Sequence, residues 1–216
     1  MRYEDEVKSR FPDLKVLTSR VKDVQVQKSS ESLADFKDQV ISQVREKRDL
    51  DELKDVSIFR KYRDFFWDLG IDPTKTRPAS EALIRRILQG KEIPTINTLV
   101  DAYNLASIKS EIPLAAFDHK NLDGELKLRF SERGEVFRGI GMDDPKELSG
   151  DELVVSDSEK IIAIYPYRDS EETKITTDTK DVLLMVCGIP DVGGKLAEAR
   201  EIMLDYVTEY CGGEIV

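Results

Sequence analysis

The sequence is poor in the residues that metal and nucleophile chemistry requires. Its 216 residues include one histidine, His119, and two cysteines, Cys187 and Cys211, which lie far apart in the chain. One histidine cannot form an HExxH zinc site, and two distant cysteines indicate neither a disulfide framework nor a zinc site with closely spaced ligands. We therefore expect no metal, and two thiols that are buried or inert.

Other absences narrow the function further. No P-loop motif is present, and GIGMDD (139–144) supplies only two of the glycines of a dinucleotide fingerprint, so we expect no ATP or NAD cofactor. Any serine or cysteine triad would need His119 as its base, and no GxSxG motif presents a serine. His119 lies at a predicted helix-to-strand junction, where a solvated loop histidine is the favoured interpretation.

No segment has the composition of a membrane span or a signal peptide. No run approaches the ~18 apolar residues that a spanning helix needs, and the N-terminus has no apolar stretch after its charges. Hydrophobic residues make up 40% and charged residues 35% of the chain, as in a folded, soluble protein. We expect one domain over residues 1–216, in the cytoplasm and without a membrane partner.

Acidic residues outnumber basic ones, but the charge is unevenly distributed. The formal net charge is −10, which argues against the general basic surface of a nonspecific nucleic-acid binder. Residues 60–91 are the exception, with eight Lys and Arg against four acids. Solvated helix faces would explain this stretch. The alternative is a surface that contacts an RNA backbone, with the candidates Arg60, Lys61, Arg63, Arg77, Arg85 and Arg86.

The first half of the chain is predicted to be mostly helical. A strand is expected within residues 14–26. Apolar positions at helical spacing then predict four helices, over residues 29–47, about 51–69, 79–89 and 95–108. Ser30 or Ser32 is available to cap the first helix, and Gly70 to end the second.

From Pro113 onward the pattern changes to short strands. Residues 126–130 alternate between apolar and charged side chains, and further strands are predicted in 152–156, 160–167 and 181–189. The continuous apolar runs IIAI and VLLMV predict strands that are covered on both faces. A last helix should span 194–210. The expected fold class is α+β, with a helical N-terminal half, a β-sandwich-like core covered by helices, and a C-terminal helix.

Residues 93–135 contain an ordered set of polar and small residues. A helix, a proline, an Ala-Phe-Asp triplet, a glycine turn, a basic strand and a Gly-Glu pair follow one another as Val100, Asp101, Asn104, Pro113, Ala116–Asp118, Gly124, Arg129, Gly134 and Glu135. In this order and spacing the stretch resembles the tRNA-editing module of bacterial-type phenylalanyl-tRNA synthetase, the B3/B4 portion of its beta subunit. The chain would be a free-standing version of that module.

The later strands resemble those that close the site of the same module, so the resemblance covers about residues 75–190. Residues 1–70 would then be a helical and strand extension, and residues 191–212 a C-terminal helix. The resemblance implies a pocket that accepts the aminoacylated 3′ end of a tRNA and hydrolyses a mischarged ester in trans, without a cofactor.

The resemblance also implies which residues form the site. The family pocket has a threonine-asparagine pair on the helix and a histidine before the Ala-Phe-Asp triplet. Here Asn104 is kept as the catalytic candidate, Tyr103 replaces the threonine, and Ala115 replaces the histidine. These departures imply an amino acid other than tyrosine. They leave catalysis to Asn104, to backbone groups and to the ribose hydroxyl of the substrate.

A second group of polar residues lies in 165–179. Arg168 could hold a phosphate or carboxylate through its planar guanidinium, and Asp169 and Thr179 complete the candidate substrate-binding set. A surface hairpin with an Arg-Asp pair is the alternative interpretation. On the helix, Asp101 is expected to cap or pair locally, whereas Asn104 would face the interior and need partners for its amide.

Three functions remain open from the sequence. The leading hypothesis is an aminoacyl-tRNA deacylase, and the lack of an ATP motif excludes a complete tRNA ligase. The second is a noncatalytic module that binds RNA, an amino acid or a small metabolite. The third is a structural domain whose pocket is filled by a side chain such as Tyr103, and a cavity near Asn104 would argue against it.

Overall fold

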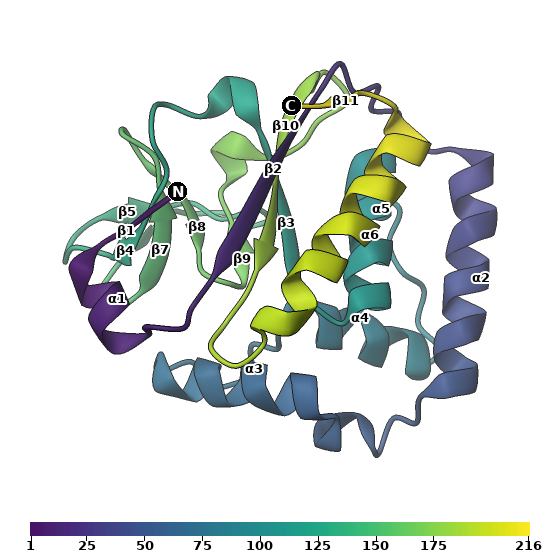
Figure 1. Ribbon diagram of the computed structural model, residues 1–216, viewed down its shortest axis with the longest axis horizontal. Helices are drawn as coiled ribbons and strands as arrows, with labels where there is room; N and C mark the ends of the chain where they lie inside the picture. The colour runs from purple at the N-terminus through teal and green to yellow at the C-terminus, as the bar shows by residue number, and fades with distance from the viewer.

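The computed structural model describes residues 1–216, which form six α-helices and two main β-sheets (Figure 1). The central sheet is antiparallel and has four strands. In spatial order these are β11 (Glu214–Ile215), β2 (Val16–Lys22), β10 (Asp181–Cys187) and β3 (Leu114–Asp118). Because β10 pairs along its length with β2 and over most of it with β3, it is the strand around which this sheet is built.

The second sheet has five strands and is joined by a small hairpin. Its spatial order is β1 (Arg2–Tyr3), β4 (Lys127–Phe130), β7 (Leu153–Ser156), β8 (Ile161–Ile164) and β9 (Arg168–Asp169). The hairpin pairs β5 (Val136–Phe137) with β6 (Lys146–Glu147). Every residue of β7 and β8 is buried, so the predicted coverage of the IIAI run on both faces is confirmed.

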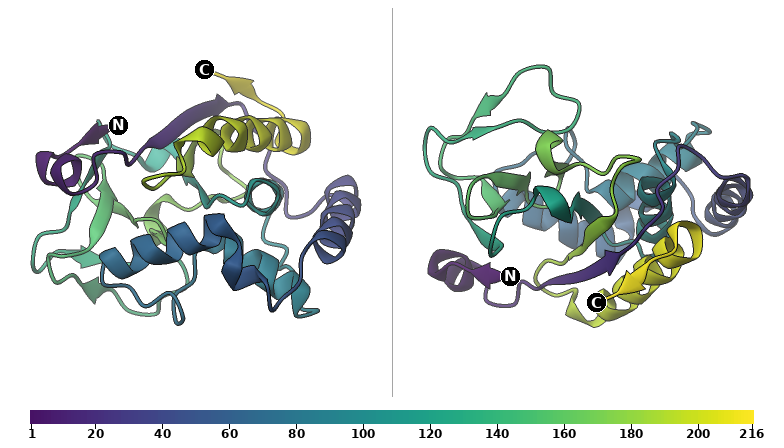
Figure 2. Two further views of the ribbon diagram at one scale, coloured as in Figure 1. Left: turned by 60° about the horizontal axis from the view of Figure 1, so that its bottom comes forward. Right: turned by 90° about the horizontal axis from the view of Figure 1, so that it is seen from above.

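Helices cover the central sheet and the lower edge of the molecule (Figures 1 and 2). Their bounds are α1 (Asp5–Arg10), α2 (Glu31–Lys47), α3 (Ser57–Asp68), α4 (Ala79–Leu88), α5 (Thr98–Ser110) and α6 (Gly193–Cys211). Helix α5 packs against α6 and β3, and α6 also contacts β2 and β10. The outermost helix, α2, packs on α4 and α5. None of the helices is long and apolar enough to cross a membrane.

A single large hydrophobic core joins both sheets to the helices. It contains 47 buried residues drawn from the strands of both sheets and from all six helices. At the end of β10, two buried tyrosine hydroxyls donate hydrogen bonds to neighbouring carbonyl groups. Tyr62 of α3 donates to the carbonyl of Cys187 at 2.7 Å, and Tyr165, which follows β8, donates to that of Gly188. These bonds fix α3 and the second sheet to the central strand.

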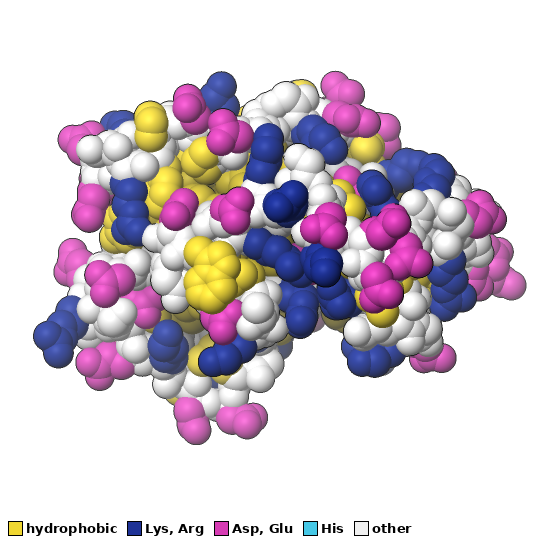
Figure 3. Space-filling view, turned by 90° about the horizontal axis from the view of Figure 1, so that it is seen from below, with side chains coloured by type: hydrophobic (Ala, Val, Ile, Leu, Met, Phe, Trp, Pro, Cys, Tyr) yellow, Lys and Arg dark blue, Asp and Glu magenta, His cyan; other side chains and the backbone are white.

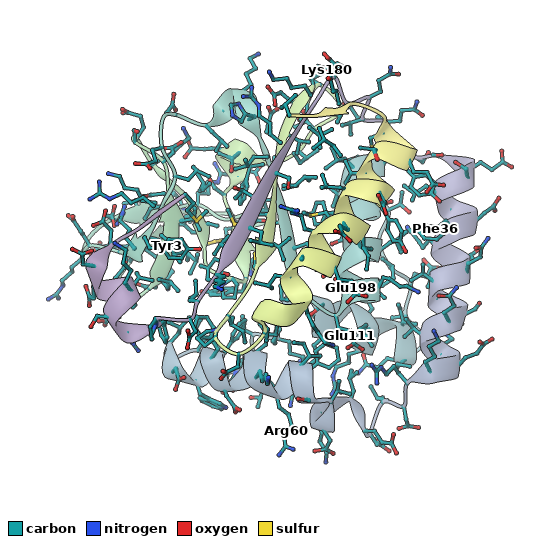
Figure 4. The ribbon with its side chains drawn as sticks, in the orientation of Figure 1. Tyr3, Phe36, Arg60, Glu111, Lys180 and Glu198 are labelled. Carbon is teal, nitrogen blue, oxygen red and sulfur yellow. The ribbon has the colours of Figure 1, made fainter.

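The α+β fold class is confirmed, and the helices predicted for residues 29–47, 79–89, 95–108 and 194–210 are present within a few residues. The outer helix α2 begins at the predicted cap, because the Ser30 hydroxyl accepts the N–H of Leu33. Its Phe36 lies between α2 and α6 (Figure 4), against Tyr206 and Tyr210 at ring-centroid distances of 4.9 and 5.5 Å.

The helix predicted over residues 51–69 is wrong in one respect. A 3₁₀ turn at Leu53–Asp55 is separated from α3 by Val56, whose extended backbone (ψ 121°) interrupts the helix. Leu53 and Phe59 are both fully buried. In a continuous α-helix, residues six positions apart point about 120° away from each other, since 3.6 residues make a turn. The break allows both side chains to enter the core.

The first 70 residues supply strands to both sheets. Strand β1 pairs with β4, and β2 pairs with β10 over the full length of each strand. The division of the chain into residues 1–70, 75–190 and 191–212 remains a prediction. Because β2 pairs with β10, residues 1–70 contribute a strand to the interior of the central sheet.

Helices α3 and α4 are joined by a buried ion pair. Glu81, in the first turn of α4, is fully buried, and its Oε2 accepts a hydrogen bond from Nε of Arg63 on α3 at 2.8 Å. Nε of Arg85, one turn further along α4, lies 3.8 Å from the other carboxylate oxygen. Two cations therefore compensate one buried carboxylate, and together they set the position of α4.

We predict that Glu81→Ala lowers the free energy of unfolding by about 3 kcal/mol, because two partly buried guanidinium groups lose their partner. Urea denaturation at neutral pH measures this change. The exposed Glu46 on α2 provides the matched control, since Glu46→Ala should stay within about 0.5 kcal/mol of the parent protein. Equal stability of the two variants would show that the pair does not hold the helices together.

Candidate functional site

Two adjoining hollows contain six of the twelve predicted site residues. The first, which we call the open hollow, has a volume of about 670 Å³. The second, which we call the small cavity, has a volume of about 60 Å³ and is far more enclosed. Ala79, the first residue of α4, belongs to the wall of both. The beginning of α4 is therefore where the two spaces meet.

The open hollow is strongly cationic. Of its 11 lining residues none is acidic, and five are basic, namely Lys75, Arg77, Arg85, Arg86 and Lys91. Asn104 of α5 completes the wall. Figure 3, which views the molecule from below, shows Lys and Arg side chains gathered in the middle of the face that carries α3. A net positive wall on an acidic protein attracts anionic ligands to this face.

Several guanidinium groups of the open hollow keep unused hydrogen-bond donors. Nε of Arg77 and Nε of Arg85 are buried and have no hydrogen-bond partner. Arg86 donates to the main-chain carbonyl of Glu92, which holds the side chain over the hollow. A buried donor without a partner is destabilising, and a planar guanidinium matches the geometry of a phosphate. The wall is suited to a phosphate-bearing ligand.

The small cavity is apolar except for one carboxyl group. Ten of its 12 lining residues are hydrophobic, and the acid among them is Asp169. Ala115 of β3, Met185 and Cys187 of β10, and Tyr165 after β8 contribute to its wall, so both sheets enclose it. The edge strand β9 carries Asp169 to this place.

Asp169 is the one carboxyl group of the small cavity, and its pKa is strongly shifted. Burial in this apolar wall raises its pKa from 3.8 to about 7, although the neighbouring Arg168 partly opposes the shift. Removal from water disfavours the charged form of a carboxyl group. A carboxyl group that is half ionised near neutral pH can both accept and release a proton, which is the property of a general base or acid.

Tyr103 lies near this carboxyl group but does not line either hollow. It is half-buried and packs against the hydrophobic core. Burial raises the pKa of its hydroxyl, and the negative charge of Asp169 raises it further. Tyr103 is therefore neutral at physiological pH and can act only as a neutral donor or acceptor. Because it packs outside the small cavity, it leaves that space open.

The structure brings the predicted residues together in two groups. Asn104 shares the open hollow with Arg77, Arg85 and Arg86. Ala115 shares the small cavity with Asp169. The prediction that Asn104 faces the interior is wrong, because its half-buried side chain lines the open hollow instead. Asn104 can therefore reach a ligand there.

Three of the basic candidates lie outside the open hollow, on α3. Arg60 is exposed and points into solvent (Figure 4). Nζ of Lys61 donates to the carbonyl of Asp191 at 2.8 Å, and Arg63 is bound to Glu81. The basic stretch of the sequence thus divides into a wall of the open hollow and a separate helix face.

Arg168 and Thr179 lie away from both hollows. The exposed Arg168 donates through Nη1 to the carbonyl of Ile140, and the buried Thr179 donates to Oδ2 of Asp118 at 2.8 Å. The alternative of a surface hairpin is present in part, since β9 with the exposed Arg168 pairs antiparallel with β8 across residues 165–167, whereas residues 171–173 form a 3₁₀ turn. Thr179 thus stabilises the end of β3.

Two other polar residues have local structural partners. Asp101 accepts the N–H of Ile96 at 3.0 Å and lies 3.5 Å from Nζ of Lys37 on α2, so the prediction of local capping or pairing is confirmed. The prediction that His119 follows a helix is wrong. It follows β3 and begins a 3₁₀ turn, with Nδ1 4.0 Å from Asp181.

The sequence predicted where α4 begins but did not identify its first turn as part of the candidate site. Pro78 occupies the N-cap position and offers no side-chain acceptor, so the first N–H groups of the helix have no capping side chain. These N–H groups begin at Ala79, where the two hollows meet. Uncapped N–H groups at a helix N-terminus favour negative charge. The proline before the helix was the only signal in the sequence.

A larger hollow lies at the other end of the second sheet and has the opposite character. Its volume is about 730 Å³, and most of its charged lining residues are acidic. Its principal carboxylates serve the fold, since Glu135 pairs with Arg129 at 2.7 Å and Asp157 accepts the N–H groups of Glu159 and Lys160 at 2.8 Å. Such a surface repels phosphate. The open hollow and the small cavity are therefore the better candidate site.

Comparison with known proteins establishes the family. Residues 61–212 match the family model of the B3/4 domain, and because this match covers more than half of the chain, the protein belongs to that family. Strands β3, β8, β9 and β10 and helices α4 and α5, which contribute residues to the two hollows, lie within the matched region.

The relatives are subunits of a tRNA ligase. The chain is 37% identical over 92 residues to the phenylalanine–tRNA ligase beta subunit of Vibrio vulnificus, a match that covers 43% of this chain and 11% of that subunit. For the same subunit of Aquifex aeolicus the identity is 34% over 106 residues, covering 49% of this chain and 13% of that subunit. The chain therefore spans only a small part of the length of these relatives.

A solved structure supports the same fold. The crystal structure of an N-terminal fragment of the phenylalanyl-tRNA synthetase beta subunit from Pyrococcus horikoshii superposes with a TM-score of 0.53 at 15% identity. The superposition covers 99% of this chain and 49% of that fragment. At this identity the similarity establishes the fold alone.

The raised pKa of Asp169 predicts that the folded state becomes less favoured as the pH rises. Between about pH 4, where an unfolded aspartate titrates, and about 7, the pKa of Asp169 in the fold, the folded protein binds a proton that the unfolded chain has lost. The free energy of unfolding should fall across this window. Asp169→Asn removes this contribution, so the variant should gain stability relative to the parent as the pH rises.

Urea denaturation at about pH 5 and about pH 8 measures this difference, with the exposed Asp178→Asn as the control. The relative stability of Asp169→Asn should be constant below about pH 4 and again well above pH 7. Parallel stability curves for the parent and this variant across the window would contradict the assignment.

Proposed function

We propose that this protein binds the 3′ end of an aminoacylated tRNA and hydrolyses the ester that joins a small amino acid to the terminal ribose. The observation that carries this proposal is the meeting of two chemically different spaces at Ala79. One is cationic and open, as a nucleotide chain requires. The other is apolar and enclosed, as an amino-acid side chain requires.

The open hollow supports the RNA half of this function. Phosphate contacts by Lys and Arg provide most of the affinity of proteins for nucleic acids. Lys75 and Lys91 are exposed at its rim, and Arg77, Arg85 and Arg86 form the wall. The related beta subunits belong to a ligase that acts on tRNA, which favours RNA over other polyanions.

The size of the small cavity supports a small aminoacyl group. A volume of about 60 Å³ corresponds to about four water molecules, at about 10–15 Å³ each. A methyl, hydroxymethyl or thiol side chain fits such a space, whereas a phenol ring does not. The substrate class expected is therefore alanyl, seryl or cysteinyl ester.

Asp169 supports hydrolysis in the absence of a histidine. Its carboxylate would accept a proton from a water molecule, whose oxygen adds to the ester carbonyl. The bond to the ribose oxygen then breaks, and that oxygen takes up the proton. The uncapped N–H groups of α4 and the amide of Asn104 are the donors available for the developing oxyanion. Ala115 leaves room beside Asp169 for the water.

A noncatalytic binding module remains the second candidate. The observation that favours it is Ala115, which provides no titratable group at the position where the related module has a histidine. Such a module would bind aminoacyl-tRNA, and its folded state would be stabilised by the ligand without turnover.

Deacylation of a panel of aminoacylated tRNAs tests the function. We expect the protein to release alanine, serine or cysteine from at least one tRNA faster than buffer does, and to leave tyrosyl- and phenylalanyl-tRNA unchanged. The rate should rise with pH up to about 7, the pKa of Asp169, and Asp169→Asn should abolish this dependence. If every ester survives at the buffer rate, the hydrolase is excluded, and a thermal shift with the same tRNAs would support the binding module.

Asn104→Ala should lower kcat/KM for the deacylated tRNA at least about tenfold, the loss of one transition-state donor. Single-turnover deacylation measures this effect. Asn121→Ala, an exposed asparagine outside both hollows, is the matched control and should retain the parent rate. Equal rates for both variants would remove Asn104 from the mechanism.

The double variant Lys75→Glu/Lys91→Glu should weaken tRNA binding and reduce its dependence on salt, because two phosphate contacts are replaced by repulsion. Fluorescence anisotropy of labelled tRNA at two salt concentrations measures both effects. Lys120→Glu/Lys180→Glu changes the same charge on exposed lysines outside the open hollow and provides the control. The proposed path of the RNA is wrong if the two double variants bind alike.

A further inference from the structure

Helix α3 exposes the sole tryptophan of the chain. Trp67 is 55% exposed, an unusual state for the largest apolar side chain. We propose that Trp67 is a platform on which a base of the single-stranded 3′ end of the RNA stacks. This inference rests on the proposed function, and it adds a contact surface outside both hollows.

The position of Trp67 on α3 places it on a face that also carries two arginines and the exposed Asp64. Residues three and four apart share one face of a helix, so Arg60, Arg63 and Trp67 form one row. Helix positions on the other side of α3, such as Ile58, Tyr62 and Phe66, are buried in the core. The indole therefore lies on the outer surface, on the same face as the exposed guanidinium of Arg60 and the partly buried guanidinium of Arg63.

A short series of contacts links this row to the meeting point of the two hollows. Arg63 binds Glu81, which lies two positions after Ala79 on α4. The loop that leads to Lys75 and Arg77 begins directly after α3, where the N–H of Gly70 binds the carbonyl of Trp67 at 2.9 Å.

A second series of contacts runs to the small cavity. Phe66, the neighbour of Trp67, packs on Tyr167 at a ring-centroid distance of 6.1 Å, and Tyr167 lines that cavity. Trp67 is therefore one position along the chain from a residue that packs on the wall of the small cavity.

The surroundings of Trp67 indicate a nucleic acid as its occupant. Figure 3 shows exposed hydrophobic surface next to Lys and Arg side chains on the face that carries α3. Proteins bind single strands by combining a cationic track for the backbone with aromatic rings that stack on the bases. A row of one indole and two arginines, leading to a wall of five cations, has both components.

The tryptophan provides its own test, because all tryptophan emission of this protein comes from Trp67. A short single-stranded RNA that ends in CCA should quench this emission in proportion to the bound fraction measured by anisotropy. Trp67→Ala should weaken binding of this RNA about tenfold, and Trp67→Phe should retain most of the affinity. Val136→Ala, at an exposed hydrophobic residue of the β5–β6 hairpin, is the matched control and should bind like the parent.

The outcomes separate this inference from the proposed function. The stacking contact is overturned if the RNA binds without quenching, or if it binds Trp67→Ala as tightly as the parent. Equal quenching by a blunt RNA duplex would also overturn it. Failure of the short RNA to bind at all would also overturn it. The deacylation assay with whole aminoacyl-tRNA is independent of these results. If Trp67→Ala hydrolyses the ester at the parent rate, the proposed function holds without the stacking contact.

Discussion

The hydrogen bonds at the end of β10 constrain the rest of the structure. Two buried tyrosine hydroxyls, those of Tyr62 and Tyr165, hold the carbonyls of Cys187 and Gly188. Gly188 has no room for a side chain, since a Cβ there would lie 2.2 Å from the carbonyl oxygen of Lys15. The strand end is thus fixed by α3, by the second sheet and by close backbone packing. Because Tyr165 and Cys187 also line the small cavity, the same bonds set its shape.

Electrostatics divides the molecule into two regions. The chain as a whole carries a net charge of −10, and its largest hollow is mainly acidic. The open hollow reverses this sign with five cations and no acid. An acidic body repels phosphate in general, whereas the local cations attract it at one place. Under the proposed function, such a distribution would favour one local RNA contact over coating by nucleic acid and would make binding sensitive to salt.

The small cavity shows how one substitution alters the chemistry that a fold can perform. The small cavity has Ala115 where the sequence resemblance implies a histidine in the family, and its one carboxyl group is Asp169, from a different strand. Its pKa of about 7 results from burial, which disfavours the charged carboxylate. The folded state is therefore less favoured above neutral pH. Proteins keep such destabilising groups where activity needs them, and structural ion pairs elsewhere restore stability. The Glu81 pair beside the site is one of these.

The sequence by itself determined four of the six helices within a few residues, the α+β class and the family resemblance, because caps and apolar periodicity are local signals. It also indicated the basic stretch and Asn104. Only the tertiary structure decided that α4 and the loop before it bring Arg77, Arg85 and Arg86 to Asn104, and that β9 carries Asp169 to Ala115. Neither the break at Val56 nor the exposure of Trp67 could be predicted, since both depend on which helix face the core accepts. Side chains far apart in sequence meet through strand pairing and helix packing, which local periodicity does not encode.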